Sequence, residues 1–248
     1  MDLIEQIEDI VRECGEIILK ADRSDAGIDA KSGKANFVTK YDKAVQKVLE
    51  EKLMAVLPDA VFIGEEEDVH KAAGEGYAFV VDPIDGTTNF IKDYHASCIS
   101  VGILKNKEPY IGVIYNPYLD EMYTAKQGSG AFLNGKRIHV SDKSLDKGLV
   151  VFGTAPYYEE FARKTFDTAF DYFGKCLDIR RSGSAALDMC SVATGRCEIY
   201  FEYRVCPWDI CAGTVLVREA GGKVTTMDGK DVSMSEQCSV KATNGICE

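Results

Sequence analysis

Two strand-like runs of this chain end in acidic residues, and this feature constrains the fold and the chemistry most. The run AVFIG leads into Glu65, and the run YAFVV leads into Asp82, with Asp85 three residues later across a proline. Short runs of β-branched and aromatic residues are typical of buried strands. Carboxylates that crowd together repel one another, so they either keep protons through raised pKa values or share a divalent cation.

Helical patterns precede these runs, and an antiparallel meander follows them. Apolar residues recur every three or four positions in residues 3–18 and in residues 39–57, which predicts two amphipathic helices. The Gly- and Lys-containing stretch between them, residues 27–37, is typical of a loop or hairpin. Asn134 and Gly135 are typical of a tight turn between strands. The predicted strands of the meander are residues 98–105, 110–117 and 121–138.

Strand and helix patterns alternate again in the second half of the chain. The order is β, α, β, α, β, α, followed by two closing strands, over residues 149–153, 159–175, 177–181, 184–195, 197–203, 210–222, 223–227 and 239–245. No linker, repeat or low-complexity stretch separates the two halves. We therefore predict an α+β or layered α/β body whose subdomains, residues 1–145 and 146–248, share a cleft.

Composition narrows the range of partners and compartments. The 248 residues carry a net charge of -11 without a Lys/Arg-rich run, so we expect no nucleic-acid partner. No apolar stretch approaches the roughly 20 residues of a membrane-spanning helix, and the N-terminus is acidic and amphipathic. We expect a cytoplasmic protein without membrane contact. The nine scattered cysteines predict reduced, mostly buried thiols.

Three acidic groups stand at the ends of predicted elements. They are Glu65, Glu66 and Glu67 in GEEE, Asp82 and Asp85 in DPIDGTT, and Asp209 in CPWDICAG. A divalent cation is the simplest way to neutralise such a cluster, and carboxylate and carbonyl oxygens suit magnesium. The Pro83 turn would aim the Ile84 carbonyl at the same point. Gly86, Thr87 and Thr88 could open a short helix whose N–H groups favour a phosphate. Metal and anion cradle together indicate phosphoryl chemistry.

Each acidic group on its own has a simpler interpretation. Asp82 and Asp85 could form a plain turn or cap a helix, and GEEE could be a solvated acidic face. Asp209 could be an N-cap, and Asp42 could be a surface residue at the start of a helix. Three such groups that each follow a strand-like run favour one shared site instead.

These motifs, in this order and at these separations, resemble the inositol monophosphatase family. The resemblance rests on GEEE, DPIDGTTNF and WDICAG, and also on NFVTKYD, RSGSAALDMCSVATG and LVREAGGKV. It implies a layered αβαβα sandwich of the inositol monophosphatase and fructose-1,6-bisphosphatase type, and a homodimer. It also implies a lithium-sensitive hydrolase that splits a small phosphomonoester with two or three Mg²⁺ ions.

The resemblance assigns roles to individual residues. Glu65, Asp82 and the carbonyl of Ile84 would hold the first metal ion, and Asp82, Asp85 and Asp209 the second. Thr87 and Asp42 would activate the attacking water, with Glu66 as an outer support. Two cations that bridge the phosphate generate a hydroxide and neutralise the leaving alkoxide, so no covalent protein nucleophile is required. Most of the acceleration then comes from charge neutralisation and positioning.

The resemblance also indicates where the substrate binds. Gly86, Thr87 and Thr88 would cradle the phosphate, and ring hydroxyls would meet Gly183, Ser184, Ala185 and Glu202. Arg204 departs from the inositol-type pattern, and it could pair with Glu202 or grip a second phosphate. We expect myo-inositol monophosphate as the substrate. Relatives of the same fold leave open a fructose-1,6-bisphosphatase, a 3'(2'),5'-bisphosphate nucleotidase or a histidinol-phosphatase.

Two functions without phosphate turnover also fit an acidic globular chain. A binding or scaffold protein could keep the fold and the metals, but it has no use for the water-activating pair Thr87 and Asp42. An ion-buffering protein would carry acids at the spacing of a twelve-residue calcium loop, and the sequence has no such loop. A phosphate-release assay with magnesium separates both from an enzyme.

Overall fold

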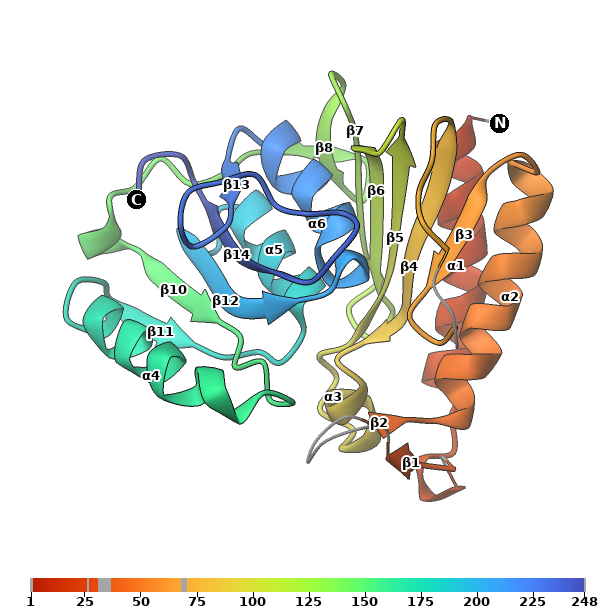
Figure 1. Ribbon diagram of the computed structural model, residues 1–248, viewed down its shortest axis with the longest axis horizontal. Helices are drawn as coiled ribbons and strands as arrows, with labels where there is room; N and C mark the ends of the chain where they lie inside the picture. The colour runs from red at the N-terminus through yellow and green to blue at the C-terminus, as the bar shows by residue number, and fades with distance from the viewer. Residues whose placement is uncertain (1, 26, 31–36, 68–70, 248) are drawn as a thin grey trace.

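The protein folds into five alternating layers of helix and sheet (Figure 1). The structure is a computed structural model, and it describes residues 2–25, 27–30, 37–67 and 71–247. In Figure 1 the layers run from α1 and α2 on the right, through a large sheet, α5 and α6, and a second sheet, to α4 on the lower left. The layered αβαβα sandwich predicted from the resemblance is confirmed.

The first layer consists of α1 (Leu3–Leu19) and α2 (Lys40–Val56). Both predicted amphipathic helices are present, and each begins with a capping box. At the start of α2 the Thr39 hydroxyl accepts hydrogen bonds from the backbone N–H groups of Tyr41 and Asp42. The Asp42 carboxylate in turn accepts a hydrogen bond from the Thr39 N–H. The apolar faces of both helices pack on one face of the large sheet. The capping box of α2 and this packing together fix where Asp42 lies relative to the sheet.

The large sheet has seven strands in sequence order. They are β3 (Val61–Gly64), β4 (Tyr77–Asp85), β5 (Cys98–Lys105), β6 (Glu108–Asn116), β7 (Glu121–Lys126), β8 (Gly130–Leu133) and β9 (Lys136–Ile138). β3 and β4 are parallel, and every later pair is antiparallel, as the predicted meander requires. Asn134 and Gly135 both have positive φ between β8 and β9, which confirms the tight turn.

The middle layer is formed by α5 (Ala185–Ala193) and α6 (Pro207–Glu219). Most residues of α6 are buried, because the helix packs between the two sheets. Its backbone approaches the large sheet closely. A Cβ atom added to Gly112 of β6 would lie 2.3 Å from the Ala212 carbonyl oxygen of α6. This close packing fixes the N-terminus of α6, which carries Asp209.

The second sheet and its outer helix form the last two layers. The sheet has the order β11 (Asp178–Arg180), β10 (Leu149–Phe152), β12 (Ile199–Val205), β14 (Cys238–Thr243) and β13 (Lys223–Thr225). β10 is parallel to β11 and β12, whereas β14 is antiparallel to β12 and β13. α4 (Glu159–Phe173) covers its outer face. The predicted β and α order of residues 149–245 is confirmed.

Short elements complete the chain. β1 (Asp29–Ala30) and β2 (Phe37–Val38) pair antiparallel, while residues 31–36 of the predicted loop or hairpin lie outside the described residues. The short helix α3 (Thr87–Ile91) follows β4 directly. Two 3-10 turns, η1 and η2, span Arg23–Asp25 and Leu145–Lys147.

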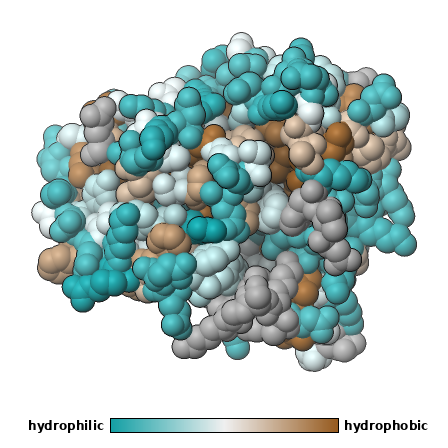
Figure 2. All heavy atoms as spheres, in the orientation of Figure 1, coloured by the Kyte–Doolittle hydropathy of each residue, from teal (hydrophilic) through white to brown (hydrophobic). Residues whose placement is uncertain are grey.

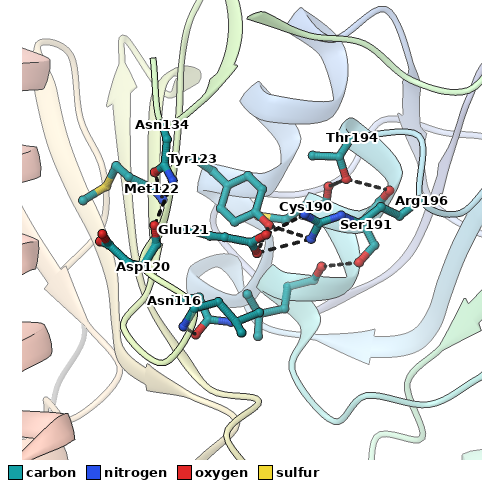
Figure 3. Close-up of polar contacts among 12 residues, drawn as sticks. Asn116, Asp120, Glu121, Met122, Tyr123, Asn134, Cys190, Ser191, Thr194 and Arg196 are labelled. Carbon is teal, nitrogen blue, oxygen red and sulfur yellow. Dashed lines mark hydrogen bonds and ion pairs between the residues drawn. The ribbon is translucent and has the colours of Figure 1, made fainter. Parts of the chain in front are cut away.

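A polar cluster joins the large sheet to the middle layer (Figure 3). Arg196, just after α5, contacts both oxygens of Glu121 on β7 and donates to the Tyr123 hydroxyl over 3.0 Å. The Tyr123 hydroxyl in turn donates to Glu121. The side chain of Asn134 bonds the backbone of Asp120 and Met122, which holds the adjoining turn. The two halves are thus connected by more than apolar packing, although the boundary at residues 145 and 146 stays a prediction.

The visible face of the molecule is mainly hydrophilic (Figure 2). In Figure 2 hydrophilic side chains cover most of the visible face, with hydrophobic ones in small groups between them. No helix among the described residues is long and apolar enough to span a membrane. All nine cysteines are free thiols, and six of them are buried, as predicted.

Candidate active site

A cavity of about 570 Å³ opens at the ends of β4, β12 and α6. Every residue predicted to hold metal lines it, and these residues are Glu65, Asp82, Ile84, Asp85 and Asp209. The residues predicted to bind substrate line it too, and they are Gly86, Thr87, Thr88, Gly183, Ser184, Ala185, Glu202 and Arg204. Residues as far apart in sequence as Glu65 and Asp209 therefore meet in one place. The roles assigned to them remain predictions.

Asp82 and Asp85 lie on the last residues of β4, where pairing with β5 shifts register. This irregularity turns the strand between the two acids. The Ile84 N–H donates to Asp82 Oδ1 over 3.0 Å, so the turn holds the Asp82 carboxylate. Both acids are buried, at 3% and 7% exposure. These low exposures exclude the interpretation of this motif as a surface turn.

Asp85 is fixed by the N-terminus of α5. Its Oδ2 atom accepts from the Ser184 hydroxyl over 2.5 Å and from the Ala186 N–H over 2.7 Å. The Ser184 hydroxyl also accepts from Leu187, as the N-cap of α5. Since this hydroxyl already serves the helix and Asp85, its direct contact with substrate stays a prediction. Asp85 also lines the cavity.

Asp209 lies in the first turn of α6. Its Oδ2 atom accepts from the Cys206 N–H over 2.6 Å, and Pro207 occupies the start of the helix. The predicted alternative, a plain N-cap, is therefore wrong by position, because Cys206 is the N-cap and Asp209 is the third helical residue. The carboxylate caps the helix and lines the cavity at the same time.

The acids raise one another's pKa values. Burial raises the pKa of Asp82 well above its usual range, and the charges of Glu65, Asp85 and Asp209 raise it further. Burial also raises the pKa of Asp85 to about 6, against the hydrogen bond from Ser184. The pKa of Asp209 is raised by burial and then by Asp85 and Glu65. Burial and mutual repulsion are the causes expected where carboxylates crowd together away from water.

The donor atoms at this end of the cavity fit magnesium. Within the described ranges, no three acidic, His or Cys side chains stand close enough to form a complete metal-binding group by themselves. Magnesium does not require such a group, since it binds through one or two carboxylates together with waters and substrate phosphate. The residues Glu65, Asp82, Asp85 and Asp209 supply hard oxygens, and the Ile84 carbonyl adds a neutral one.

Thr87 and Asp42 come together as predicted, although they lie on different layers. The Thr87 hydroxyl is 3.3 Å from Asp42 Oδ1 and 3.1 Å from the Ile84 carbonyl oxygen. The other oxygen of Asp42 accepts from the backbone and hydroxyl of Thr39. Asp42 is 1% exposed, so it is not a surface residue. Burial raises its pKa to about 6, although the Thr39 hydrogen bonds oppose this shift.

Gly86 allows α3 to begin directly after the acids. It has φ of 86°, and an added Cβ would lie 2.9 Å from the Ala96 carbonyl oxygen. The Asn89 side chain of α3 donates to the carbonyls of Ala96 and Ser182, which ties α3 to the loop before α5. The short helix predicted at residues 86–88 is therefore present, with Thr87 as its first residue.

Glu66 does not line the cavity. Its backbone N–H donates to the side chain of Gln46 on α2 over 2.9 Å. The neighbouring Glu67 side chain accepts from the Gly64 N–H. This arrangement joins the GEEE turn to α2, so the run is not a plain solvated face. An outer supporting role for Glu66 stays a prediction.

Glu202 and Arg204 lie on β12 and line another wall of the cavity, and they do not form an ion pair with each other. Glu202 accepts from the Ala155 N–H over 2.6 Å and from the Tyr200 hydroxyl over 2.8 Å. Arg204 donates to the Gln237 side chain over 2.7 Å, and its guanidinium lies 4.8 Å from the centre of the Tyr158 ring. Of the two roles expected for Arg204, the ion pair with Glu202 is therefore not formed, because Arg204 contacts Gln237 and Tyr158 instead. Binding of a second phosphate stays a prediction.

Several residues of this wall were not predicted from the sequence. They are Thr154, Tyr157, Tyr158, Arg181, Asp188 and Gln237, all of which line the cavity. One signal was available for the two tyrosines, because they follow Pro156 directly after a predicted strand, where loops carry binding residues. Gln237 had no such signal, since only the pairing of β12 with β14 brings it near Arg204.

A comparison with known families matches this arrangement over the whole chain. The sequence model described as "Inositol monophosphatase family" matches residues 2–248. The chain belongs to that family. As a member of the inositol monophosphatase family it is a phosphomonoester hydrolase, as the sequence predicted.

Individual relatives agree with this assignment. An inositol-1-monophosphatase of Synechocystis is 38% identical, over 88% of this chain and 76% of the relative. A fructose-1,6-bisphosphatase/inositol-1-monophosphatase of Aquifex aeolicus is 37% identical, over 82% of this chain and 77% of the relative. The crystal structure of the extragenic suppressor protein SuhB from Bartonella henselae has a TM-score of 0.91. It is 29% identical and covers 98% of this chain and 94% of that one.

Proposed function

We propose that this protein hydrolyses myo-inositol monophosphate to inositol and phosphate with the help of Mg²⁺. The observation that carries the proposal is the convergence of Asp82, Asp85, Asp209 and Thr87 on one cavity, with Asp42 hydrogen-bonded to Thr87 behind it. Glu65, Asp82 and the Ile84 carbonyl would hold one ion, and Asp82, Asp85 and Asp209 a second. Bound magnesium would neutralise phosphate charge and lower the pKa of water.

The protein's own contribution to proton transfer lies in Thr87 and Asp42. As its hydroxyl donates to Asp42, the Thr87 oxygen can accept a proton from the attacking water. Asp42 has a pKa of about 6, close enough to neutral pH for a carboxylate to take up that proton efficiently. Thr39 holds the second oxygen of Asp42, so the first keeps its direction toward Thr87. The Gly86 turn places the first N–H groups of α3 beside this pair, where a phosphate oxygen can be bound.

Glu202 supports a polyol as the leaving group. Each of its oxygens already accepts one hydrogen bond, and each retains capacity for a second. Substrate hydroxyls can therefore donate to a carboxylate whose orientation is fixed in advance. The guanidinium of Arg204 supports a second candidate, a sugar bisphosphate. Its contacts with Gln237 and Tyr158 leave the terminal nitrogens of the guanidinium for an anion.

The relatives named above match both candidates, because one is named for inositol phosphate alone and one for inositol phosphate and fructose 1,6-bisphosphate. A substrate panel decides between them. Phosphate release is compared by kcat/KM for inositol 1-phosphate, fructose 1,6-bisphosphate, a nucleoside 3',5'-bisphosphate and histidinol phosphate. We expect the highest value for inositol phosphate. A bisphosphate that is hydrolysed at least tenfold better would replace it.

Assembly and location complete the proposal. We expect a homodimer, as the family resemblance implies, and a cytoplasmic location, for which nine free thiols are suited to a reducing compartment. We also expect lithium to inhibit uncompetitively by occupying the place of the second ion. A scaffold function without turnover is disfavoured by the Thr87–Asp42 hydrogen bond, which a passive protein does not need.

A further inference from the structure

The loop that follows β10, residues 153–158, forms part of the cavity wall that the sequence analysis did not foresee. In Figure 1 this loop extends from β10 toward α3 before α4 begins. It carries two adjacent tyrosines, Tyr157 and Tyr158, into the lining of the cavity. The surroundings of these two side chains differ, and this difference identifies one of them as a ligand contact.

The backbone of this loop is held in place. Ala155 has φ of 40°, a left-handed conformation that is costly for alanine, and it is 2% exposed. Its N–H donates to Glu202 Oε1 over 2.6 Å, and its carbonyl accepts from the Tyr158 N–H over 2.9 Å. Gly153 is bonded to Phe201, and an added Cβ would overlap the Glu202 carboxylate. The direction of the two tyrosines is therefore set by the fold of the loop.

Tyr158 is fully engaged with protein atoms. Its hydroxyl exchanges hydrogen bonds with the Gln237 side chain at 3.0 and 3.2 Å. Its ring lies under the guanidinium of Arg204 and beside Phe161. Nothing in this arrangement requires a ligand, so we interpret Tyr158 as a support for Arg204.

The ring of Tyr157 packs edge-on against that of Tyr158, but its hydroxyl has no such partner. Its side chain is 45% exposed, and its hydroxyl makes no hydrogen bond within the part of the chain that the structure describes. Burial of the hydroxyl raises its pKa, and the charges of Glu65, Asp209, Asp82 and Asp85 raise it further. Tyr157 lines the same cavity as these four carboxylates. Its phenolic O–H is a hydrogen-bond donor that no protein acceptor among the described residues occupies.

We propose that Tyr157 is a substrate contact whose hydroxyl donates to a non-bridging phosphoryl oxygen. This inference rests on the proposed function, because the four carboxylates define where the phosphoryl group binds. A neutral donor suits that position, since it adds a bond to the phosphoryl oxygen without competing for the cations. The rigid loop holds the donor in place before substrate arrives, which limits the entropy lost on binding. The contact does not involve the leaving group, so it serves every phosphomonoester equally.

The test compares Tyr157→Phe with Tyr94→Phe, which removes the same hydroxyl from an exposed tyrosine outside the cavity. Inorganic phosphate is titrated in the presence of MgCl2, and binding is followed by fluorescence of Trp208, the single tryptophan, which lines the cavity. A lost hydrogen bond to a charged group should raise the Kd of phosphate about tenfold or more in Tyr157→Phe. Tyr94→Phe should match the wild type.

Kinetics give a second readout of the same contact. In Tyr157→Phe, kcat/KM should fall by the same factor for inositol 1-phosphate and for 4-nitrophenyl phosphate, with an unchanged unfolding temperature. A phosphate Kd within twofold of wild type overturns the proposal, as does a loss confined to one of the two esters. Absence of phosphate binding by the wild type overturns it as well. If the wild type binds phosphate but cleaves no ester, the proposed function fails, while the Kd ratio still decides the role of Tyr157.

Discussion

The two sides of the cavity are built in different ways. On the acidic side, backbone N–H groups hold the carboxylates: Ile84 holds Asp82, and Cys206 holds Asp209. On the other side, Glu202 is also held by a backbone N–H, that of Ala155, but Arg204 and Gln237 hold each other through their side chains. Backbone contacts at element ends survive most substitutions, whereas contacts between side chains change with a single residue. From this comparison we expect substitutions on the acidic side to affect every substrate and substitutions at Arg204 or Gln237 to affect substrate choice.

The acidic side should be intolerant of any change in charge. Asp82 is expected to contact both metal ions, and an amide cannot supply its charge, so Asp82→Asn should lower kcat by more than about 1,000-fold. Steady-state phosphate release checks this, with Asp59→Asn on the surface as the matched control. The folded state should persist, because the change removes a buried charge that its neighbours repel. Activity within tenfold of wild type would contradict the two-metal arrangement.

The proton path should be the next most sensitive feature. Thr87→Val keeps the shape of the side chain but removes the hydroxyl that joins Asp42 to the water. We expect kcat to fall about 10²- to 10⁴-fold with little change in KM, as is usual for lost general-base catalysis. Thr168→Val, which removes a hydroxyl bonded to Tyr203 on the outer side, is the control. An unchanged kcat would remove Thr87 from the mechanism.

The other side should respond selectively. Glu202→Gln keeps an oxygen for the Ala155 N–H but weakens the acceptor for ring hydroxyls. We expect kcat/KM for inositol 1-phosphate to fall by a factor equivalent to about 1.5 to 3 kcal/mol of activation free energy, and kcat/KM for 4-nitrophenyl phosphate to change little.

Glu198→Gln provides a matched control for this change. Glu198 is buried at the other end of β12, where it accepts from the Leu149 N–H over 2.6 Å and occupies the space beside Gly148. It holds the backbone as Glu202 does, but it lies outside the cavity lining. An equal loss on both esters in Glu202→Gln would mean that Glu202 acts only through the loop.

The smallest expected effect concerns stability. Asp42 and Asp85 have pKa values of about 6 in the folded protein and about 3.9 when unfolded, so the folded state binds more protons between these values. Stability of the metal-free protein should therefore fall as pH rises from about 4 to 7. Magnesium at a hundredfold excess over its Kd should add about 2.7 kcal/mol at pH 7.5, or roughly 5 to 10 °C in unfolding temperature.

Thermal unfolding at pH 5 and 7.5, with EDTA or with magnesium, checks this expectation. In Asp82→Asn the unfolding temperature should depend less on pH, because the substitution removes a carboxylate that interacts with Glu65, Asp85, Asp209 and Asp42. An unfolding temperature in EDTA that rises between pH 5 and 7.5 would mean that the carboxylates are compensated within the protein.

The contrast between the two sides also explains what the sequence could predict. The acids follow strand-like runs, and Gly86 with Thr87 marks a helix start, so local patterns place them. The layered order was available only through the family resemblance. The other side depends on the sheet order β10, β12, β14, which brings Glu202 to Ala155 and Gln237 to Arg204. No local pattern encodes these contacts, and the positive φ of Ala155 has no signature in its sequence.

The most direct test of the central claim is phosphate release from inositol 1-phosphate by the wild-type protein, measured with MgCl2 and again with EDTA. Our account predicts turnover with magnesium, loss of turnover in EDTA, and recovery when magnesium is restored. Asp82→Asn should stay inactive under all three conditions. Turnover that persists in EDTA, or a wild type that releases no phosphate from any of the esters named above, would contradict it.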